Sequence, residues 1–300
     1  MPSDVAPFIP LSAADLAATE MRPRPVLLAP FLRNESLTLL LGPRGVGKSY
    51  TALGIARAVA SGEPFLGWQP LRPLKVAYVD GELSGYDLQQ RLKSFGPPPD
   101  KLEFVIGSMR GNRTPDLSKG DQWEALWAPW LPDKGPYLLV IDSLSSLIGS
   151  EGKEASAWAI ARRFLLYLRT WGYSVLVVHD GSARGHARGS RRLEDVFDTI
   201  LSLRRPDDYQ PSEGLRYELH FSKARGLVGS DLEPFEARMT VDAAGYAHWH
   251  RQAVGSVEIH RMAGLLKDGL NPLQAAKQLG LSKSKAYRLR DRAVSFGLLT

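Results

Sequence analysis

The chain has 300 residues, of which 44% are hydrophobic and 23% charged, a composition typical of a folded globular protein and not of a disordered or fibrous one. The absence of cysteine excludes disulfide bonds and thiolate zinc sites. No apolar run is long enough to cross a bilayer, and the first residues lack the basic stretch of a secretory signal, so we expect a cytoplasmic protein without a membrane partner.

The positive charge is concentrated at the carboxyl end of the chain. Residues 257–300 contain eight Lys or Arg and three acidic residues, whereas the net charge of the whole chain is +6. Almost all of the excess charge therefore lies in this segment. A local excess of basic residues is the electrostatic signature of nucleic-acid binding, so we expect DNA as a partner.

The first part of the chain differs in composition from the rest. Residues 1–25 are rich in proline and contain one short helical pattern near 13–20, so we expect an N-terminal arm. Two alternatives stay open at this point: the arm packs on a neighbouring subunit, or it is a loosely ordered tail.

The segment 42–49 has the pattern G-x-x-x-x-G-K-S of a phosphate-binding loop. The apolar run 37–41 before it predicts a buried strand, and the spacing of apolar residues in 50–60 predicts a helix. Strand, glycine-rich turn and helix N-terminus together bring backbone N–H groups to a phosphate. We expect Lys48 to contact the β- and γ-phosphates and Ser49 to bind Mg²⁺. The predicted nucleotide-binding residues of the loop are Gly42, Pro43, Arg44, Gly45, Val46, Gly47, Lys48, Ser49 and Tyr50.

Further along the chain, apolar strands alternate with helical patterns. Strand patterns occupy 75–80, 102–106, 136–143 and 173–179, and helical patterns occupy 85–94 and 155–170. This alternation predicts an α/β fold with a mostly parallel central sheet and helices on both faces. Four later strand patterns predict an antiparallel edge of the sheet, at 199–203, 215–221, 235–241 and 246–249.

The strand pattern at 136–143 contains a carboxylate near its end. Four to five apolar residues followed by Asp142 are typical of the strand that presents the Mg²⁺-associated aspartate of P-loop proteins. Asp142 is therefore expected at the nucleotide, and Ser49 and Asp142 are expected to bind Mg²⁺. The predicted cofactors are ATP and Mg²⁺.

Four motifs of the chain resemble those of the RecA-like P-loop ATPases: L-L-L-G-P-R-G-V-G-K-S, V-A-Y-V-D-G-E, L-L-V-I-D-S-L and V-V-H-D…R-G-S. The resemblance covers about residues 25–245. It is strongest to the RepA-type ATPases of plasmids and phages, a branch that includes hexameric replicative helicases. It implies a RecA-like ATPase domain, which we place at 26–252, and a ring-forming homo-oligomer such as a hexamer.

The resemblance also implies roles for single residues. Glu82, after the second strand, would orient and polarise the attacking water, with Asp80 as its rival and a solvated carboxylate as the alternative. His179 would sense the γ-phosphate, unless it is a structural histidine at a strand end. Lys223 and Arg225 are the candidates for a basic finger that completes a neighbour's site, against a basic edge strand or turn.

The segment 180–192 is glycine-rich and basic, and the resemblance implies that it faces the ring channel and contacts single-stranded DNA. The predicted contacts are Arg184, Arg188 and Arg191. The segment departs from the family, because relatives often have a second histidine or a lysine shortly after the strand. It also lacks aromatic residues for base stacking. A purely structural glycine loop is the alternative.

Residues 257–300 resemble a helix-turn-helix domain, preceded by a linker at 253–256. Asn271 and Pro272 predict the start of one helix, and Gly280 permits the turn before the next. That next helix would bind duplex DNA through Lys283, Ser284, Lys285 and Arg288. A three-helix oligomerisation or protein-docking module with a solvated basic face is the alternative.

The sequence as a whole favours a Mg²⁺-dependent ATPase that acts on DNA, as a ring-forming helicase or replication ATPase of RepA type. The alternative function is an ATP-switched DNA-binding regulator, or a partition or recombination ATPase, without unwinding activity. Both would use the same P-loop chemistry. They differ in whether the loops at 143–156 and 180–192 hold a DNA strand.

Overall fold

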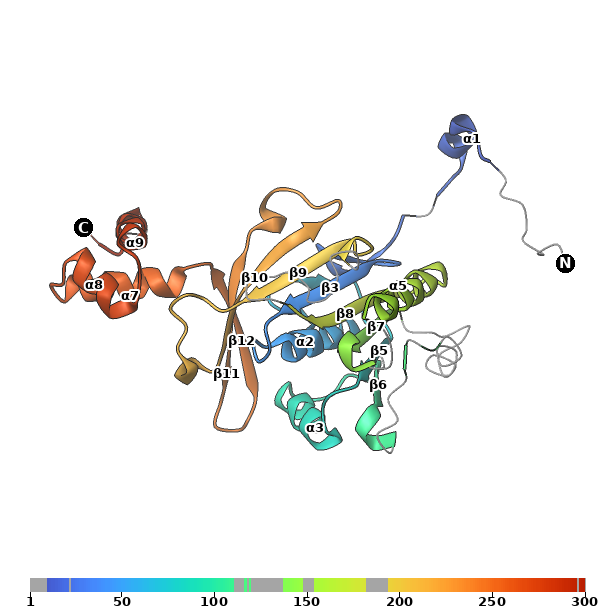
Figure 1. Ribbon diagram of the computed structural model, residues 1–300, viewed down its shortest axis with the longest axis horizontal. Coiled ribbons are helices and arrows are strands. Elements are labelled where there is room, and N and C mark those ends of the chain that lie inside the picture. Colours follow the sequence, from blue (N-terminus) through green and yellow to red (C-terminus); the bar gives the residue numbers. More distant parts are fainter. Residues whose placement is uncertain are drawn as a thin grey trace.

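The computed structural model describes residues 10–21, 23–110, 116–117, 119, 137–147, 154–181, 194–295 and 297–299. A nine-stranded mixed sheet has the order β12-β11-β10-β9-β3-β8-β7-β5-β6 (Figure 1). Its strands are β3 (Leu37–Gly42), β5 (Val76–Asp80), β6 (Leu102–Ile106), β7 (Leu138–Asp142), β8 (Ser174–Asp180), β9 (Thr199–Arg204), β10 (Leu215–Ala224), β11 (Phe235–Val241) and β12 (Ala247–Ala253). The helices are α1 (Ala13–Ala18), α2 (Lys48–Ser61), α3 (Gly85–Ser94), α5 (Glu154–Thr170), α7 (Ser256–Lys267), α8 (Pro272–Leu279) and α9 (Lys283–Ser295). Short 3₁₀ turns occupy Gly107–Arg110, Leu144–Leu147, Pro211–Glu213 and Gly229–Leu232.

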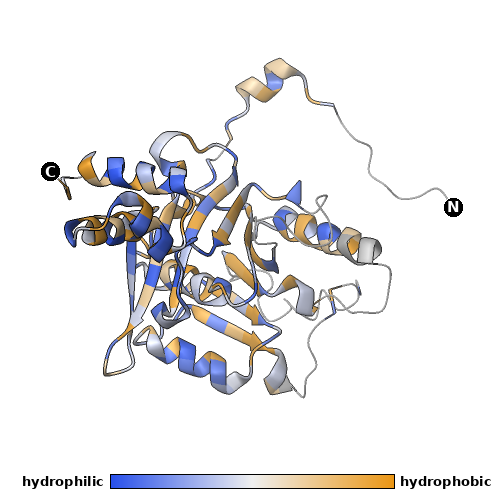
Figure 2. Cartoon of the chain, turned by 60° about the vertical axis from the view of Figure 1, so that its left-hand side comes forward, coloured by the Kyte–Doolittle hydropathy of each residue, from blue (hydrophilic) through white to orange (hydrophobic). Residues whose placement is uncertain are grey.

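The strands from β9 across to β6 run parallel to one another. All residues of β3, β5 and β7 are buried, and such strands need cover on both faces of the sheet. α2 and α3 supply it on one face, and α5 packs on the other through Ala161, Phe164 and Leu165. The predicted α/β fold is confirmed, and Figure 2 shows hydrophobic residues along these central strands.

The other end of the sheet is antiparallel, as predicted, because β10, β11 and β12 add to β9 as successive antiparallel strands. A second, three-stranded sheet was not predicted. It has the order β2-β1-β4 and consists of β1 (Val26–Ala29), β2 (Leu32–Arg33) and β4 (Gln69–Pro70). Strands of two to four residues carry too few positions for a hydrophobic period to be recognised.

The last three helices form a small bundle, which we call the helical unit (α7, α8 and α9). Its core consists of Ile259, Met262, Ala263, Ala275, Ala276, Ala286, Leu289 and Ala293. α8 begins at Pro272, where the side chain of Asn271 accepts hydrogen bonds from two backbone N–H groups of the first turn. Gly280 ends α8 with a φ angle of 68°, a conformation that favours glycine. Figure 1 shows this unit beside the antiparallel end of the sheet.

At the other end of the chain, α1 buries none of its residues and stands away from the sheet in Figure 1. Residues 1–9 and 22 of the predicted arm lie outside the described residues. Within the part of the chain that the structure describes, no helix combines the length and the apolar content needed to span a membrane.

Candidate nucleotide-binding site

The loop between β3 and α2 depends on three glycines. Gly45 and Gly47 have φ angles of 73° and 116°, which glycine adopts without strain. Gly42 has no room for a side chain, because a Cβ atom would lie 2.8 Å from Val46 Cγ1 and 3.0 Å from the carbonyl oxygen of Leu203. α2 follows directly, so the unpaired N–H groups of its first turn face the loop. The loop therefore has the geometry of an anion site.

A cavity of about 550 Å³ lies over this loop, at the carboxyl ends of the parallel strands. Open α/β sheets bind ligands at this edge. The predicted residues that line it are Arg44, Gly45, Gly47, Lys48, Ser49, Tyr50, Glu82 and Asp142. Leu83, Arg91, Ser143, Val178, Asp180, Arg205, Gly214 and Leu215 complete the wall. The structure thus brings together loop residues and carboxylates that are far apart in the sequence.

Lys48 uses all three of its N–H donors on oxygens of the chain itself. Its ammonium nitrogen lies 3.0 Å from the carbonyl oxygens of Gly42 and Pro43 and 2.9 Å from Asp180 Oδ1. Asp180 also accepts a hydrogen bond from Arg44 Nε at 2.8 Å. Partial burial would raise the pKa of Asp180, but the hydrogen bonds from Arg44 and Lys48 outweigh it and lower that pKa. A phosphate that binds Lys48 therefore competes with Asp180 and the two carbonyl oxygens for its N–H donors.

Asp142, at the end of β7, is only 2% exposed. Tyr78 donates a hydrogen bond to Asp142 Oδ2 at 2.6 Å, and Ser49 hydrogen-bonds to the same carboxyl group. Burial raises the pKa of Asp142 to about 6, against the two hydrogen bonds, and the charges of Asp80 and Glu82 add to the rise. A carboxylate in such surroundings is stabilised by a nearby cation.

The Ser49 hydroxyl and the Asp142 carboxylate fit the expected Mg²⁺ ion. Both are oxygen donors, which Mg²⁺ prefers, and they lie within hydrogen-bonding distance of each other. In the described ranges, no group of three His, Asp or Glu residues is placed to hold a metal. Sites in which Mg²⁺ takes one or two protein ligands, with phosphate and water as the rest, need no such group.

Two carboxylates follow one another at the end of β5, in different surroundings. Asp80 is 1% exposed, and its Oδ1 accepts the backbone N–H groups of Glu82 and Leu83 at 3.0 and 2.7 Å. Asp80 therefore holds the turn. Glu82 is exposed, lines the cavity and accepts a hydrogen bond from Ser143. Of the two, the geometry favours Glu82 as the group that reaches a water molecule in the cavity.

The structure does not bring His179 to the cavity. Neighbouring residues of β8 face opposite sides of the sheet: Val178 lines the cavity, whereas Val177 packs in the cluster that includes α5. By this alternation His179, which is 3% exposed, lies on the α5 side. Asp180 is the residue that reaches the phosphate loop. Asp180 was not predicted as a site residue, because the strand pattern alone does not tell which face of β8 meets the phosphate loop.

Lys223 and Arg225 lie at the far end of β10 from the cavity. Leu215 begins β10 at the cavity wall, and Arg225 lies ten residues further on, about 33 Å along an extended strand. The side chain of Arg225 is 60% exposed. Lys223 donates hydrogen bonds to the carbonyl oxygens of Glu194 and Asp195. Neither residue reaches the cavity of its own subunit, so a role as a finger requires a neighbouring one.

The predicted DNA contacts fall into two groups. Arg184, Arg188 and Arg191 lie outside the described residues. On α9, three of the four predicted residues are exposed: Lys283, Ser284 and Arg288. The fourth, Lys285, is half-buried, and its ammonium nitrogen lies 2.7 Å from both Asp207 and Glu258. Lys285 thus attaches α9 to the rest of the protein and does not face outward as expected.

Besides Asp180, three further residues that contact predicted site residues were not predicted from the sequence. Tyr78 faces Asp142, and alternation within V-A-Y-V-D was a signal that Tyr78 and Asp80 share one side of β5. Ser143 contacts Glu82. Arg205 donates a hydrogen bond to the carbonyl oxygen of Gly45 at 2.6 Å. It lies 160 residues from that glycine, so no local pattern indicated the contact.

Comparison with known proteins agrees with this geometry. A model of the family described as "AAA domain" matches residues 2–185. No curated protein matches the chain. Among solved structures, the chain is similar to the flagellar accessory protein FlaH from Methanocaldococcus jannaschii, with 14% sequence identity, a TM-score of 0.49, and coverage of 72% of this chain and 90% of that one. Because the family match extends over more than half of its length and includes the phosphate loop, the chain belongs to the AAA domain family.

Proposed function

We propose that the protein hydrolyses ATP with Mg²⁺ and couples hydrolysis to action on DNA, as a ring-forming helicase or replication ATPase of RepA type. One observation carries the enzymatic part. Lys48, the Ser49–Asp142 pair and Glu82 converge on one cavity of about 550 Å³ at the carboxyl ends of the parallel strands. This is the set of groups that phosphoryl transfer to water requires.

Each group has a distinct task in this proposal. The loop N–H groups and Lys48 hold the phosphates, and Ser49 and Asp142 hold Mg²⁺. Bound Mg²⁺ neutralises the charge that develops on the phosphate oxygens. Glu82 orients the attacking water and accepts its proton. Positioning and electrostatics supply most of the rate enhancement in this kind of reaction.

The assembly into a ring is supported by the position of Lys223 and Arg225. Both lie at the edge of the sheet opposite the cavity of their own subunit, so a role in hydrolysis would require the site of another subunit. A basic group that enters from a neighbour stabilises charge on the transferring phosphate and makes hydrolysis depend on assembly.

DNA binding is supported by the exposed face of α9 and the charge of its segment. Lys283, Ser284 and Arg288 are exposed on one helix of the helical unit, which suits contacts to a duplex and its phosphates. Single-stranded DNA would bind in the ring channel through the basic segment 180–192.

The second candidate function is an ATP-switched DNA-binding regulator. A specific observation favours it: ion pairs connect the helical unit directly to the segment beside the nucleotide cavity. In that case nucleotide would control the helical unit, and no strand would be unwound.

The test is steady-state ATP hydrolysis at low salt, alone and with single-stranded or duplex DNA, with Lys48→Ala as the blank. A ten-fold or larger stimulation by single strands, with unwinding of a forked duplex, supports the helicase. Turnover that responds only to duplex DNA supports the regulator. Turnover equal to that of Lys48→Ala under all conditions would exclude both.

A further inference from the structure

A short segment contacts both the nucleotide cavity and the helical unit. This segment, Arg205–Gly214, links β9 to β10, and we call it the connector. We propose that Arg205 is a positioning residue that makes nucleotide affinity depend on the docking of the helical unit. The inference rests on the proposed function in one respect, because it assumes that the P-loop binds nucleotide.

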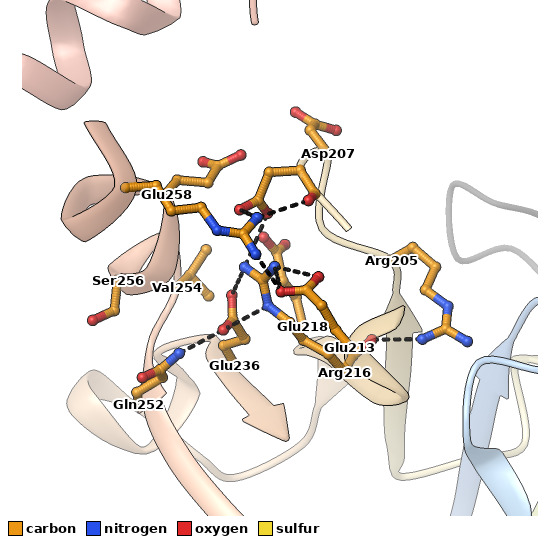
Figure 3. A network of polar contacts seen from close by, with 12 residues as sticks. Arg205, Asp207, Glu213, Arg216, Glu218, Glu236, Gln252, Val254, Ser256 and Glu258 are labelled. Carbon is orange, nitrogen blue, oxygen red and sulfur yellow. Dashed lines mark hydrogen bonds and ion pairs between the residues drawn. The ribbon is translucent and has the colours of Figure 1, made fainter. Parts of the chain in front are cut away.

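At its first end the connector holds the phosphate loop. Arg205 lines the cavity, and its guanidinium donates a hydrogen bond to the carbonyl oxygen of Gly45 at 2.6 Å. The same guanidinium donates to the carbonyl oxygen of Arg216 at 2.8 Å and lies 3.9 Å from the ring centroid of Tyr209. Figure 3 shows the guanidinium of Arg205 beside the backbone of Arg216. A shift of the connector therefore moves a donor that fixes the P-loop backbone.

At its other end the connector holds the helical unit. Arg261 of α7 donates hydrogen bonds to the carbonyl and carboxylate oxygens of Asp208 at 3.1 and 2.9 Å, and to Glu213 at 2.5 Å. Lys285 of α9 lies 2.7 Å from Asp207. Two basic residues of the helical unit are thus paired with three acidic residues of the connector.

Asp208 and Glu213 are shared between the helical unit and the sheet. Both pair with Arg216, at 2.9 and 3.1 Å, and Arg216 also pairs with Glu236 at 2.9 Å (Figure 3). Burial would lower the pKa of Arg216, but the carboxylates, Glu236 first, raise it. Asp208 and Glu236 are almost fully buried. When the helical unit undocks, Asp208 and Glu213 lose their ion pairs with Arg261. The connector then has to rearrange around Arg216, the cation that remains.

The sign of the coupling follows from these contacts. A docked helical unit fixes Asp208 and Glu213, which fixes the connector and keeps Arg205 on the carbonyl of Gly45. The phosphate loop is then preorganised, and nucleotide binding costs less ordering. Undocking loosens Arg205 and weakens binding. By linkage, nucleotide must favour docking by the same factor.

A double-mutant cycle tests the proposal. The probe is a fluorescent ATP analogue with Mg²⁺, bound to the full-length chain carrying Arg205→Ala, Arg261→Gln with Lys285→Gln, or all three. We expect the Arg261/Lys285 pair of changes to raise the Kd about five-fold in the wild-type background. In the Arg205→Ala background the same pair should change the Kd less than about two-fold. Equal effects in both backgrounds, or no effect in the wild type, would overturn the proposal.

Matched controls separate coupling from general damage. Lys267→Gln with Lys277→Gln removes the same charge from exposed positions of the helical unit and should leave the Kd unchanged. Arg57→Ala is the control for Arg205→Ala. Arg57 lies outside the connector and donates hydrogen bonds to one carbonyl oxygen and one carboxylate. If Lys48→Ala binds the probe as well as the wild type does, the nucleotide site itself is wrong and both proposals fail. If Lys48→Ala loses binding but the Arg261 and Lys285 changes have the same effect with and without Arg205, only the proposed coupling through Arg205 is wrong.

Discussion

Two regions of the molecule hold cations against carboxylates in different ways. In the cavity, Asp180 pairs with Lys48 and Arg44, and its side chain keeps 20% exposure. At the antiparallel end of the sheet, Arg216 has no exposure and pairs with three carboxylates. This pair borders the open cavity and is exchangeable, because water or a phosphate that enters the cavity can replace one partner. A buried network is permanent, because each lost partner leaves a charge without solvent. The first arrangement suits a ligand site and the second a structural joint.

The largest effect is expected when the permanent network is broken. Arg216→Leu leaves the buried carboxylates of Asp208 and Glu236 without their cation, which should lower the free energy of unfolding by about 3–5 kcal/mol. Arg238→Leu, at an exposed position of β11, is the control and should stay within about 0.5 kcal/mol of the wild type. Urea denaturation measures both. If Arg216→Leu lowers the free energy of unfolding by only about 1 kcal/mol or less, the buried network around Arg216 does not stabilise the fold as proposed.

Removal of the proposed base tests the chemical part of the cavity. Glu82→Gln should reduce kcat by about 10²–10⁴-fold, because proton transfer to a positioned carboxylate is lost. The Kd for ATP should stay close to that of the wild type. Asp80→Asn is the comparison, since Asp80 holds the turn and does not line the cavity. Full turnover in Glu82→Gln, or a larger loss of kcat in Asp80→Asn, would reassign the base.

The raised pKa of Asp142 predicts opposite pH responses of stability and metal binding. Between its ordinary value of 3.8 and about 6, the folded protein binds more protons than the unfolded one, so the free energy of unfolding falls as pH rises through this window. Asp142→Asn should therefore be more stable than the wild type at pH 7.5, by about 3 kcal/mol.

Metal binding has the opposite sign, because Mg²⁺ needs the ionised carboxylate. The Mg²⁺ concentration for half-maximal hydrolysis should rise as pH falls from 7.5 through about 6. Denaturation and Mg²⁺ titration at several pH values measure the two responses. A stability difference between wild type and Asp142→Asn that does not change with pH would contradict the assignment.

The exchangeable pair of Asp180 and Lys48 predicts a smaller effect. Most changes at a binding site weaken ligand binding, whereas a change of Asp180 should strengthen it. Asp180→Asn removes the carboxylate that competes with phosphate for Lys48, so ATP should bind about five-fold tighter, which corresponds to ~1 kcal/mol. Asp100→Asn, an exposed change outside the cavity, is the control. Equilibrium binding of a fluorescent ATP analogue is the measurement. Weaker binding in Asp180→Asn would mean that Asp180 supports the bound state.

Much of the fold could be predicted from local patterns. The helix Gly85–Ser94 and the strand Leu102–Ile106 have the predicted bounds, because capping residues and apolar periods mark them clearly. β1, β2 and β4 were missed because they are too short to carry a period. Within the site, Lys48, Ser49, Glu82 and Asp142 converge as expected.

The errors at the site have a common cause. His179 and Asp180 are neighbours in sequence, and which of them faces the phosphate loop depends on the phase of β8 within the sheet. Lys285 was expected to face outward like Lys283, the other lysine of α9, yet it contacts Asp207 and Glu258. In both cases the partner lies far away along the chain, so composition and spacing carried no information about it.

The sequence by itself determined the chemistry of this protein: the G-x-x-x-x-G-K-S loop, the apolar strand before Asp142 and the basic end are local patterns whose physical consequences need no partner. The tertiary structure alone decided which of these groups contact one another. It set Asp180 against Lys48, separated Arg225 from its own cavity and placed Arg205 between Gly45 and the connector. The physical reason is that burial and charge pairing are properties of neighbours in space, and strand order and register choose those neighbours.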